Sequence, residues 1–188
     1  MRKLGDLVEI RSGYTFRSAI DSFAAGDTEV IQAKDLGIDF GFAARPRILF
    51  TGESRHLLRP GEILVSARGF SKAVLFQDKE LKAVASSSLF VLTPKSNSIN
   101  SEFITMFFNS SVGMKAVFEL SSGAALKSIT KDNLAQIVIP EIPPGQERAL
   151  ARAVQALDEY RSAITKKEIY LDHIREAIIT KTLKEAAK

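Results

Sequence analysis

The chain has 188 residues, 45% hydrophobic and 26% charged, a balance typical of one globular domain with an appendage. It has no cysteine and only two histidines, which excludes disulfides, thiolate metal sites and a multi-histidine metal site within one chain. The formal charge of +4 permits an anionic partner. The sequence starts without an apolar signal core and no run approaches a membrane span, so we expect a cytoplasmic protein without membrane contact.

The N-terminal stretch begins with apolar residues spaced for one or two helical turns, at Leu4, Leu7, Val8 and Ile10. Gly13 marks a turn after them. The turn is followed by Tyr14, in a segment flanked by Arg11 and Arg17, and such side chains can stack on a nucleic acid. Aromatic residues in this position also close the end of a hydrophobic core, so both interpretations stay open.

Short strands are predicted for the middle of the chain, over residues 29–33, 47–50, 62–66, 72–76, 82–92 and 137–139. Pro60-Gly61 forms a turn before strand 62–66, and Arg68-Gly69 opens the loop that returns through 72–76. We expect a hairpin whose exposed tip carries Arg68, Phe70, Ser71 and Lys72. Three serines, Ser86 to Ser88, interrupt strand 82–92; they either donate to phosphates or form an exposed strand start.

Helical patterns dominate the rest of the domain. Phe103, Met106 and Phe107 share one face of a helix that runs to Leu120, in two pieces because of Gly113, and this stripe is typical of a core. Thr130 predicts the cap of a further short helix. In the loop before it, Lys127 and Ser128 could meet a phosphate, or Lys127 could simply be solvated.

The last stretch, residues 143–188, is predicted as one helix because it contains no proline or glycine after Pro143-Pro144-Gly145. At about 1.5 Å per residue it spans roughly 60 Å, more than one side of the domain needs. We expect most of it to pair with another helix; folding back on its own domain is the alternative. The residues expected at this dimerisation seam are Leu150, Val154, Leu157, Ile164, Leu171, Ile174 and Ile178.

Arginine is concentrated between positions 45 and 72, at Arg45, Arg47, Arg55, Arg59 and Arg68, followed by Lys72. The guanidinium fork suits phosphates and guanine edges, although such a cluster can also be a solvated surface. No phosphate-binding glycine loop, Gly-x-Ser-x-Gly motif or metal-spaced histidine pair occurs. The sequence therefore favours a binding protein over an enzyme, with no metal and no cofactor of its own.

Several stretches in order resemble the specificity subunit of type I DNA restriction-modification systems: residues 4–16, 59–69, 120–123, 127–129, 134–140 and 142–148, followed by the long helix. The resemblance implies an α+β fold, with a mixed α/β target recognition domain at residues 1–142 and a long spacer helix at 143–188. It also implies no catalytic activity. Such a subunit reads half of a two-part DNA site and docks a methyltransferase subunit, which uses S-adenosylmethionine to methylate adenine; a restriction subunit can join.

The resemblance assigns to DNA-facing loops the residues Arg11, Tyr14, Thr15, Arg68, Phe70, Lys72, Lys127 and Ser128. Charge alone adds Lys34, Arg45 and Arg47. Family members usually contain two recognition domains and two spacer helices, whereas this sequence has one of each. We therefore expect a homodimer with antiparallel long helices, which reads two inverted half-sites separated by an unread spacer.

Two other functions stay open. The chain could be a truncated regulatory subunit that pairs with a full-length specificity subunit or titrates the methyltransferase. It could also be a self-contained nuclease or methyltransferase.

Overall fold

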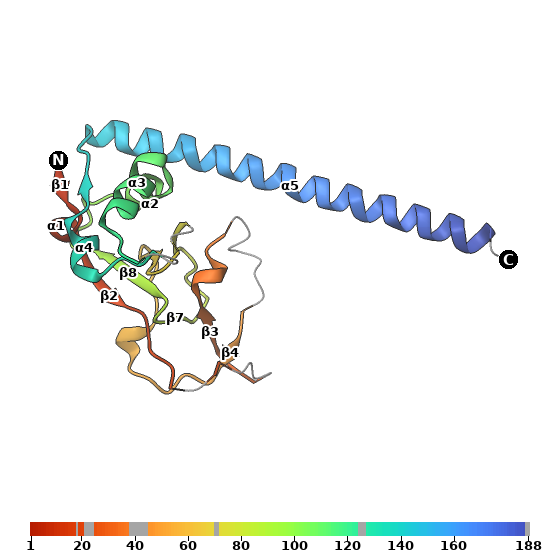
Figure 1. The fold of residues 1–188 in the computed structure, drawn as a ribbon, viewed down its shortest axis with the longest axis horizontal. Coiled ribbons are helices and arrows are strands. Elements are labelled where there is room, and N and C mark those ends of the chain that lie inside the picture. Colours follow the sequence, from red (N-terminus) through yellow and green to blue (C-terminus); the bar gives the residue numbers. More distant parts are fainter. Residues whose placement is uncertain (18, 21–24, 38–44, 70–71, 124–126, 187–188) are drawn as a thin grey trace. The chain divides into compact units, whose positions relative to one another are not determined.

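A computed structural model describes residues 1–17, 19–20, 25–37, 45–69, 72–123 and 127–186 (Figure 1). The first half contains β1 (Arg2–Lys3), α1 (Leu4–Leu7), β2 (Val8–Ser12), β3 (Thr28–Ile31), η1 (Ala33–Asp35), β4 (Arg47–Ile48), η2 (Ser54–His56), β5 (Ile63–Ser66), β6 (Ala73–Leu75), β7 (Ala83–Ala85) and β8 (Leu89–Pro94). The second half contains α2 (Ser101–Asn109), α3 (Ser111–Leu120), α4 (Lys131–Gln136), β9 (Val138–Ile139) and α5 (Pro144–Ala186). The expected α+β class, with one long C-terminal helix, is confirmed.

The described chain divides into two compact units, Met1–Ala151 and Arg152–Lys188. The division falls inside α5, because the side chain of Ala151 is buried at 3% exposure and belongs with the first unit. The beginning of α5 is therefore part of the globular unit, whereas the expected domain boundary lay between residues 142 and 143.

The described residues of the first unit form three sheets. A four-stranded antiparallel sheet has the order β2-β8-β5-β6. In the second sheet, β3 pairs antiparallel with β4 and parallel with β7. The third is a short pair in which Arg2 lies opposite Ile139, so β1 (red in Figure 1) runs beside β9. The hairpin expected around Arg68 is confirmed as β5 and β6, with Val65 opposite Ala73.

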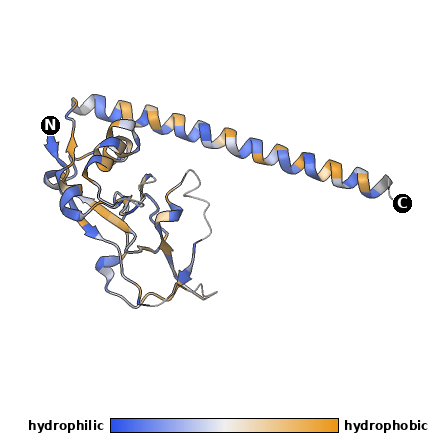
Figure 2. Cartoon of the chain, in the orientation of Figure 1, coloured by the Kyte–Doolittle hydropathy of each residue, from blue (hydrophilic) through white to orange (hydrophobic). Residues whose placement is uncertain are grey.

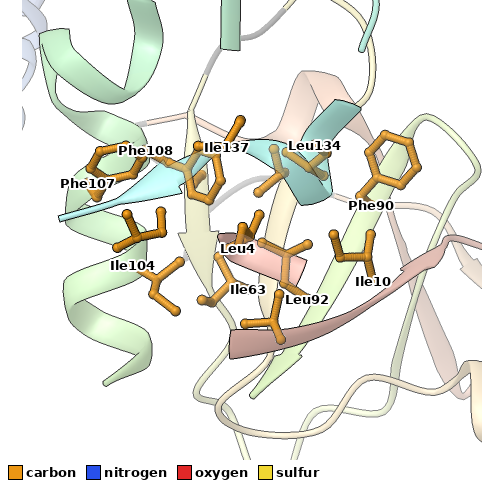
Figure 3. Packing of buried hydrophobic residues seen from close by; sticks show 14 of the residues in the cluster. Leu4, Ile10, Ile63, Phe90, Leu92, Ile104, Phe107, Phe108, Leu134 and Ile137 are labelled. Carbon is orange, nitrogen blue, oxygen red and sulfur yellow. The ribbon is translucent and has the colours of Figure 1, made fainter. Parts of the chain in front are cut away.

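The four-stranded sheet has an apolar layer on each face, because successive side chains of a strand point to opposite faces. Along β8, Phe90 and Leu92 join one core cluster, and Leu89 and Val91 join the other. The first cluster also contains Leu4, Ile10, Ile63, Ile104, Phe107, Phe108, Leu134 and Ile137 (Figure 3). The second contains Ile31, Ala83 and Ala85, which come from β3 and β7. Helices therefore cover one face of the sheet and the second sheet covers the other.

Two predicted elements, one helical and one strand, need correction. The N-terminal helix ends at Leu7, and Val8 and Ile10 lie in β2, where they alternate with outward-facing Glu9 and pair with β8. The expected single strand over 82–92 is two strands in different sheets, β7 and β8. The serines between them form the connecting turn, in which the Ser86 and Ser88 hydroxyls lie 2.7 Å apart.

The helix over 101–120 is broken at Ser110, and the break expected from Gly113 is therefore misplaced. Ser110 caps α3 by accepting a hydrogen bond from the Gly113 amide at 3.2 Å. Gly113 is needed for another reason, since a Cβ atom there would lie 2.0 Å from the Phe107 carbonyl oxygen. The expected core stripe is confirmed by Phe103 and Phe107, which are 5% and 4% exposed.

The C-terminal end of the chain contains one short strand and one long helix. β9 is shorter than the strand expected over 137–139, and its Val138 is 45% exposed, so the strand is only partly buried. The long helix agrees with the prediction, since α5 is one unbroken element of 43 residues. Among the described residues, none of the helices is apolar enough over a sufficient length to cross a membrane.

Candidate nucleic-acid interface

Several connecting segments meet at one end of the four-stranded sheet. β2 ends at Ser12, which pairs with Phe90 at the start of β8, and β5 ends at Ser66, which pairs with Leu89. β6 begins beside the end of β5. We call this end the loop cluster; its described residues are 12–15, 66–69, 72, 86–88 and 127–129. The sheet register therefore gathers segments that are far apart in the sequence.

The two loops predicted to contact DNA around Arg68 and Lys127 are joined by backbone hydrogen bonds. The Gly69 amide donates to the Lys127 carbonyl at 2.8 Å, and the Ile129 amide donates to the Ala67 carbonyl at 3.1 Å. Arg68 and Ser128 lie opposite each other in an antiparallel bridge. The two loops therefore form one small structured surface.

The side chains of the loop cluster are polar and partly cationic. Thr15 and Arg68 are exposed, and Tyr14, Lys72, Lys127 and Ser128 are partly exposed. Lys34 is exposed on η1, which adjoins this end of the sheet because the Ala33 amide donates to the Ser88 hydroxyl at 3.1 Å. Such an arrangement offers hydrogen-bond donors and positive charge to an anionic ligand.

Gly13 lets β2 approach the turn of three serines. A Cβ atom at Gly13 would lie 2.0 Å from the Ser86 carbonyl oxygen, so a side chain there cannot be accommodated without moving the backbone. The next residue also contacts the segment before this turn, since the Tyr14 amide donates to the Ala85 carbonyl at 2.7 Å. The segment that carries Tyr14 and Thr15 is therefore held by main-chain contacts.

Arg11 is tied to a buried acid. One guanidinium nitrogen of Arg11 lies 3.1 Å from the Glu62 carboxylate, and the two side chains are 23% and 5% exposed. The same carboxylate accepts hydrogen bonds from the Arg59 amide at 2.9 Å and from the Thr93 hydroxyl at 2.8 Å. This placement gives Arg11 a structural partner, and its assignment as a DNA contact stays a prediction.

Tyr14 is the centre of a group of partly exposed aromatic rings. Its ring makes edge contacts with Phe16 at 5.0 Å, Phe50 at 5.1 Å and His56 at 5.2 Å between centroids. The contacts are of the T-shaped kind that aromatic pairs prefer. These rings therefore restrain the side chain of Tyr14, which belongs to the loop cluster and is partly exposed.

The arginines that were grouped from charge alone are dispersed in the structure. The Arg45 side chain is 5% exposed and pairs with Glu29 at 3.1 Å. Arg47 is exposed on β4, opposite Glu29 on β3. Neither belongs to the loop cluster, and Phe70 lies outside the described residues, so all three remain predictions.

Two residues of the domain escaped the sequence analysis. Glu62 is predicted only as a strand start, and its burial at 4% exposure accompanies contacts with the distant donors Arg11 and Thr93, which no local pattern specifies. Phe118 was absorbed into the helix that follows Phe103, although its spacing from Val117 puts it off the buried face of α3.

The predicted dimerisation residues lie on α5, where exposed apolar and charged residues alternate (Figure 2). Leu157, Ile164, Leu171 and Ile178 follow one another every seven residues and are 68%, 43%, 53% and 61% exposed. Leu150 and Ile174 are 45% and 40% exposed, and Val154 is partly exposed. A row of exposed large apolar residues on one helix is typical of an interaction surface.

The donor set offers no metal centre: within the part of the chain that the structure describes, no group of three or more His, Asp or Glu side chains could hold a metal ion. What the loop cluster offers is a polar, cationic surface joined to a braced aromatic residue. These features define a mixed α+β binding domain followed by a long helix.

Comparison with protein families identifies the class more closely. The family model of the type I restriction modification DNA specificity domain matches residues 1–171, and the chain belongs to this family. Specificity domains of this family are non-catalytic, which agrees with the expectation of a binding protein. None of the curated proteins matches the chain.

Solved structures share the fold. The chain is similar to the type I restriction-modification S subunit of M. genitalium, with 14% identity over 84% of this chain and 38% of that one, at a TM-score of 0.59. The HsdS subunit of Thermoanaerobacter tengcongensis matches with 24% identity over 88% of this chain and 38% of that one, at 0.60. A chain from a study of complex assembly and conformational transition of the type I R-M system matches with 22% identity over 88% and 39%, at 0.65. This chain therefore spans less than two fifths of their length.

Proposed function

We propose that the chain recognises a DNA half-site and directs an adenine-N6 methyltransferase to it. The observation that supports this most directly is the convergence of Arg68, Lys72, Lys127 and Ser128 at one end of a sheet, in a chain of the DNA specificity family. The chain then supplies binding and orientation, and the methyltransferase subunit supplies S-adenosylmethionine and the methyl transfer. Function inside the cytoplasm, where DNA is accessible, is part of the proposal.

Within the loop cluster we assign different roles to two cations. The Arg68 guanidinium, exposed at the β5–β6 hairpin, is assigned to a base edge, because its fork can donate two hydrogen bonds to guanine. The Lys127 ammonium is assigned to a phosphate, where a point charge is sufficient. The first contact depends on DNA sequence and the second does not.

The experiment for these roles is a binding titration with two duplexes. One contains the site found by mapping N6-methylated adenines in the source genome, and the other has random sequence. Arg68→Ala should weaken binding to the mapped site by about 1–3 kcal/mol with less effect on random DNA. Lys127→Ala should weaken both equally. If neither substitution changes either affinity, the loop cluster is not the DNA contact.

We further propose that two copies pair through antiparallel α5 helices. The 43 residues of α5 extend over about 65 Å, and its apolar row is exposed in the single chain. The larger relatives are more than twice as long as the matched part, which is consistent with two recognition domains per functional unit. A twofold axis between the helices would give two inverted half-sites separated by a fixed spacer.

Light scattering coupled to gel filtration tests the dimer. Replacement of Leu157 and Ile164 by glutamate should reduce the mass from twice 20.6 kDa to one copy, because charges would enter an apolar contact, and should leave the recognition domain folded. Ile169→Glu is the matched control, since Ile169 is 50% exposed but lies about 140° around the helix from Ile164. A wild-type chain that stays monomeric with its methyltransferase present would exclude the homodimer.

The subunits that purify together with the chain, and the activity of the chain alone, distinguish the proposed specificity subunit from a regulatory form and from an enzyme. A complex that contains a longer specificity subunit beside this chain would favour the truncated regulatory form. The purified chain alone should neither methylate nor cleave DNA, and should support N6-adenine methylation when the methyltransferase subunit is added. A restriction subunit, if it joins, should add cleavage without changing the methylated site.

A further inference from the structure

Phe118 is a large aromatic residue on the solvent side of α3. The helix turns Val117 into the core, where it is 1% exposed, but Phe118 is 60% exposed. A ring with this exposure realises only a minor part of the stabilisation that full burial of an aromatic side chain would give. Core packing therefore does not account for this residue.

The exposed ring contacts the ammonium group of Lys127, which lies on a different segment of the chain. The Lys127 ammonium lies 4.9 Å from the centroid of the Phe118 ring, within the distance at which a cation is attracted to an aromatic face. The nearest acid along the helix, Glu119, lies 3.8 Å from Lys115. Among the described residues, no ion pair involves Lys127, so the ring is the contact that orients its head group.

The end of α3 that carries the ring is held in place. The Ser121 amide donates to the Phe118 carbonyl at 3.2 Å, and the Ser121 hydroxyl donates to the Val117 carbonyl at 2.6 Å. The Asn133 side chain donates to the Leu120 carbonyl at 2.8 Å and so ties this end to α4. These bonds satisfy carbonyls that a helix end leaves unpaired. The backbone that carries the ring is therefore held in place by hydrogen bonds.

The backbone of Lys127 is fixed as well, because its carbonyl accepts from the Gly69 amide at 2.8 Å in the loop cluster. A lysine side chain has a large rotamer entropy, part of which is lost when the ammonium binds a phosphate. A ring that already restricts the side chain lowers that loss. We propose that Phe118 is a positioning residue for DNA binding, whose ring holds the Lys127 ammonium beside the loop cluster for contact with a phosphate. The inference rests on the proposed DNA-binding function.

A double-substitution experiment on the full chain tests the coupling. The affinity for a labelled duplex of random sequence is measured over a series of KCl concentrations. Lys127→Ala should lower the steepness of log K against log [KCl] by about 0.9, the value of one phosphate contact. Phe118→Leu should weaken binding about two- to fivefold, the equivalent of an exposed cation–π contact. The same substitution should have no effect when Lys127 is already alanine.

Two further variants complete the design. Phe118→Tyr keeps an aromatic face and should bind as the wild type does. Met114→Ala removes a neighbouring exposed side chain, 44% exposed one turn earlier on α3, and should not alter DNA affinity. An upfield shift of the Lys127 ε-methylene protons, present in the wild type and absent in Phe118→Leu, should report the ring contact without DNA.

The outcomes separate this inference from the function on which it rests. Salt-dependent DNA binding by the wild type together with an unchanged affinity of Phe118→Leu overturns the role of the ring alone. An equal loss with and without Lys127 also overturns it, because the ring would then contact DNA directly or support the fold. Loss of methyltransferase binding in both Phe118→Leu and Met114→Ala, with DNA affinity kept, would mark a protein-docking surface instead. A wild-type chain that binds no DNA overturns both proposals.

Discussion

Removal of the Glu62 carboxylate should be among the most destabilising single changes in the recognition domain. Glu62 is 4% exposed and accepts hydrogen bonds from the Arg11 guanidinium, the Arg59 amide and the Thr93 hydroxyl. Glu62→Ala removes one acceptor from three donors and leaves a cavity. The arginine then keeps its charge in a largely buried site without the compensating anion.

The expected loss follows from these contacts. Breaking a buried ion pair by removing one partner costs about 3–5 kcal/mol, because the remaining charge is uncompensated. Arg11 is 23% exposed, so water can hydrate part of its guanidinium, and the lower end of the range applies. We expect Glu62→Ala to reduce the free energy of unfolding by about 3 kcal/mol. Glu62→Gln keeps one acceptor oxygen and should cost about 2 kcal/mol.

Urea unfolding followed by circular dichroism measures this difference, and a thermal melt should show a shift of roughly 6–12 °C for a chain of this size. The matched control is Glu53→Ala, which removes an exposed Arg–Glu pair whose side chains are 68% and 72% exposed. That variant should change stability by less than about 1 kcal/mol. Equal effects of the two substitutions, or a Glu62→Ala cost below about 1 kcal/mol, would refute the assignment of a buried, structural carboxylate.

Two further predictions concern the sheet ends. Gly13→Ala should destabilise the domain by at least about 1–3 kcal/mol in urea unfolding, since the new methyl meets the Ser86 carbonyl; an unchanged midpoint would contradict the close approach. The pKa of Asp27 lies below its ordinary value of 3.8, chiefly because Lys82 donates to it and secondarily because Thr28 does. The contribution of this pair to stability is therefore fully present above pH 3.8. It is lost as the pH falls through the lower pKa that Asp27 has in the folded protein. Lys82→Met should raise the Asp27 pKa in an NMR titration, and an unchanged pKa would exclude the contact.

Local sequence patterns were sufficient for the elements that depend on near neighbours. The absence of proline and glycine after Gly145 predicted α5, and the loop opened by Arg68-Gly69 between two apolar runs predicted the hairpin of β5 and β6. The three serines were recognised only as an interruption of one strand. The turn that they form could not be predicted, because a strand interrupted by small residues has the same pattern as two strands of different sheets.

Contacts between distant residues could not be predicted in the same way. Arg11 and Glu62 are separated by 51 positions, and nothing in either segment specifies the other. The run of arginines between positions 45 and 72 suggested one basic surface, yet Arg45 is directed to Glu29 by the pairing of β4 with β3. The strand register brings the segments around Arg68 and Ser128 together at one sheet end, and their contact with DNA stays a prediction.

The pairing of β1 with β9 bears on how recognition can be exchanged between proteins. Arg2 lies opposite Ile139, so the chain enters and leaves the recognition domain at neighbouring points, shortly before α5 begins at Pro144. The loop cluster lies at the other end of β2 from this junction, since β2 starts at Val8 and ends at Ser12. A recognition segment could therefore be transplanted between two adjacent splice points, and a chimaera that keeps Met1 to Leu4 and Ile137 onward should retain its own helix while acquiring foreign sequence preference.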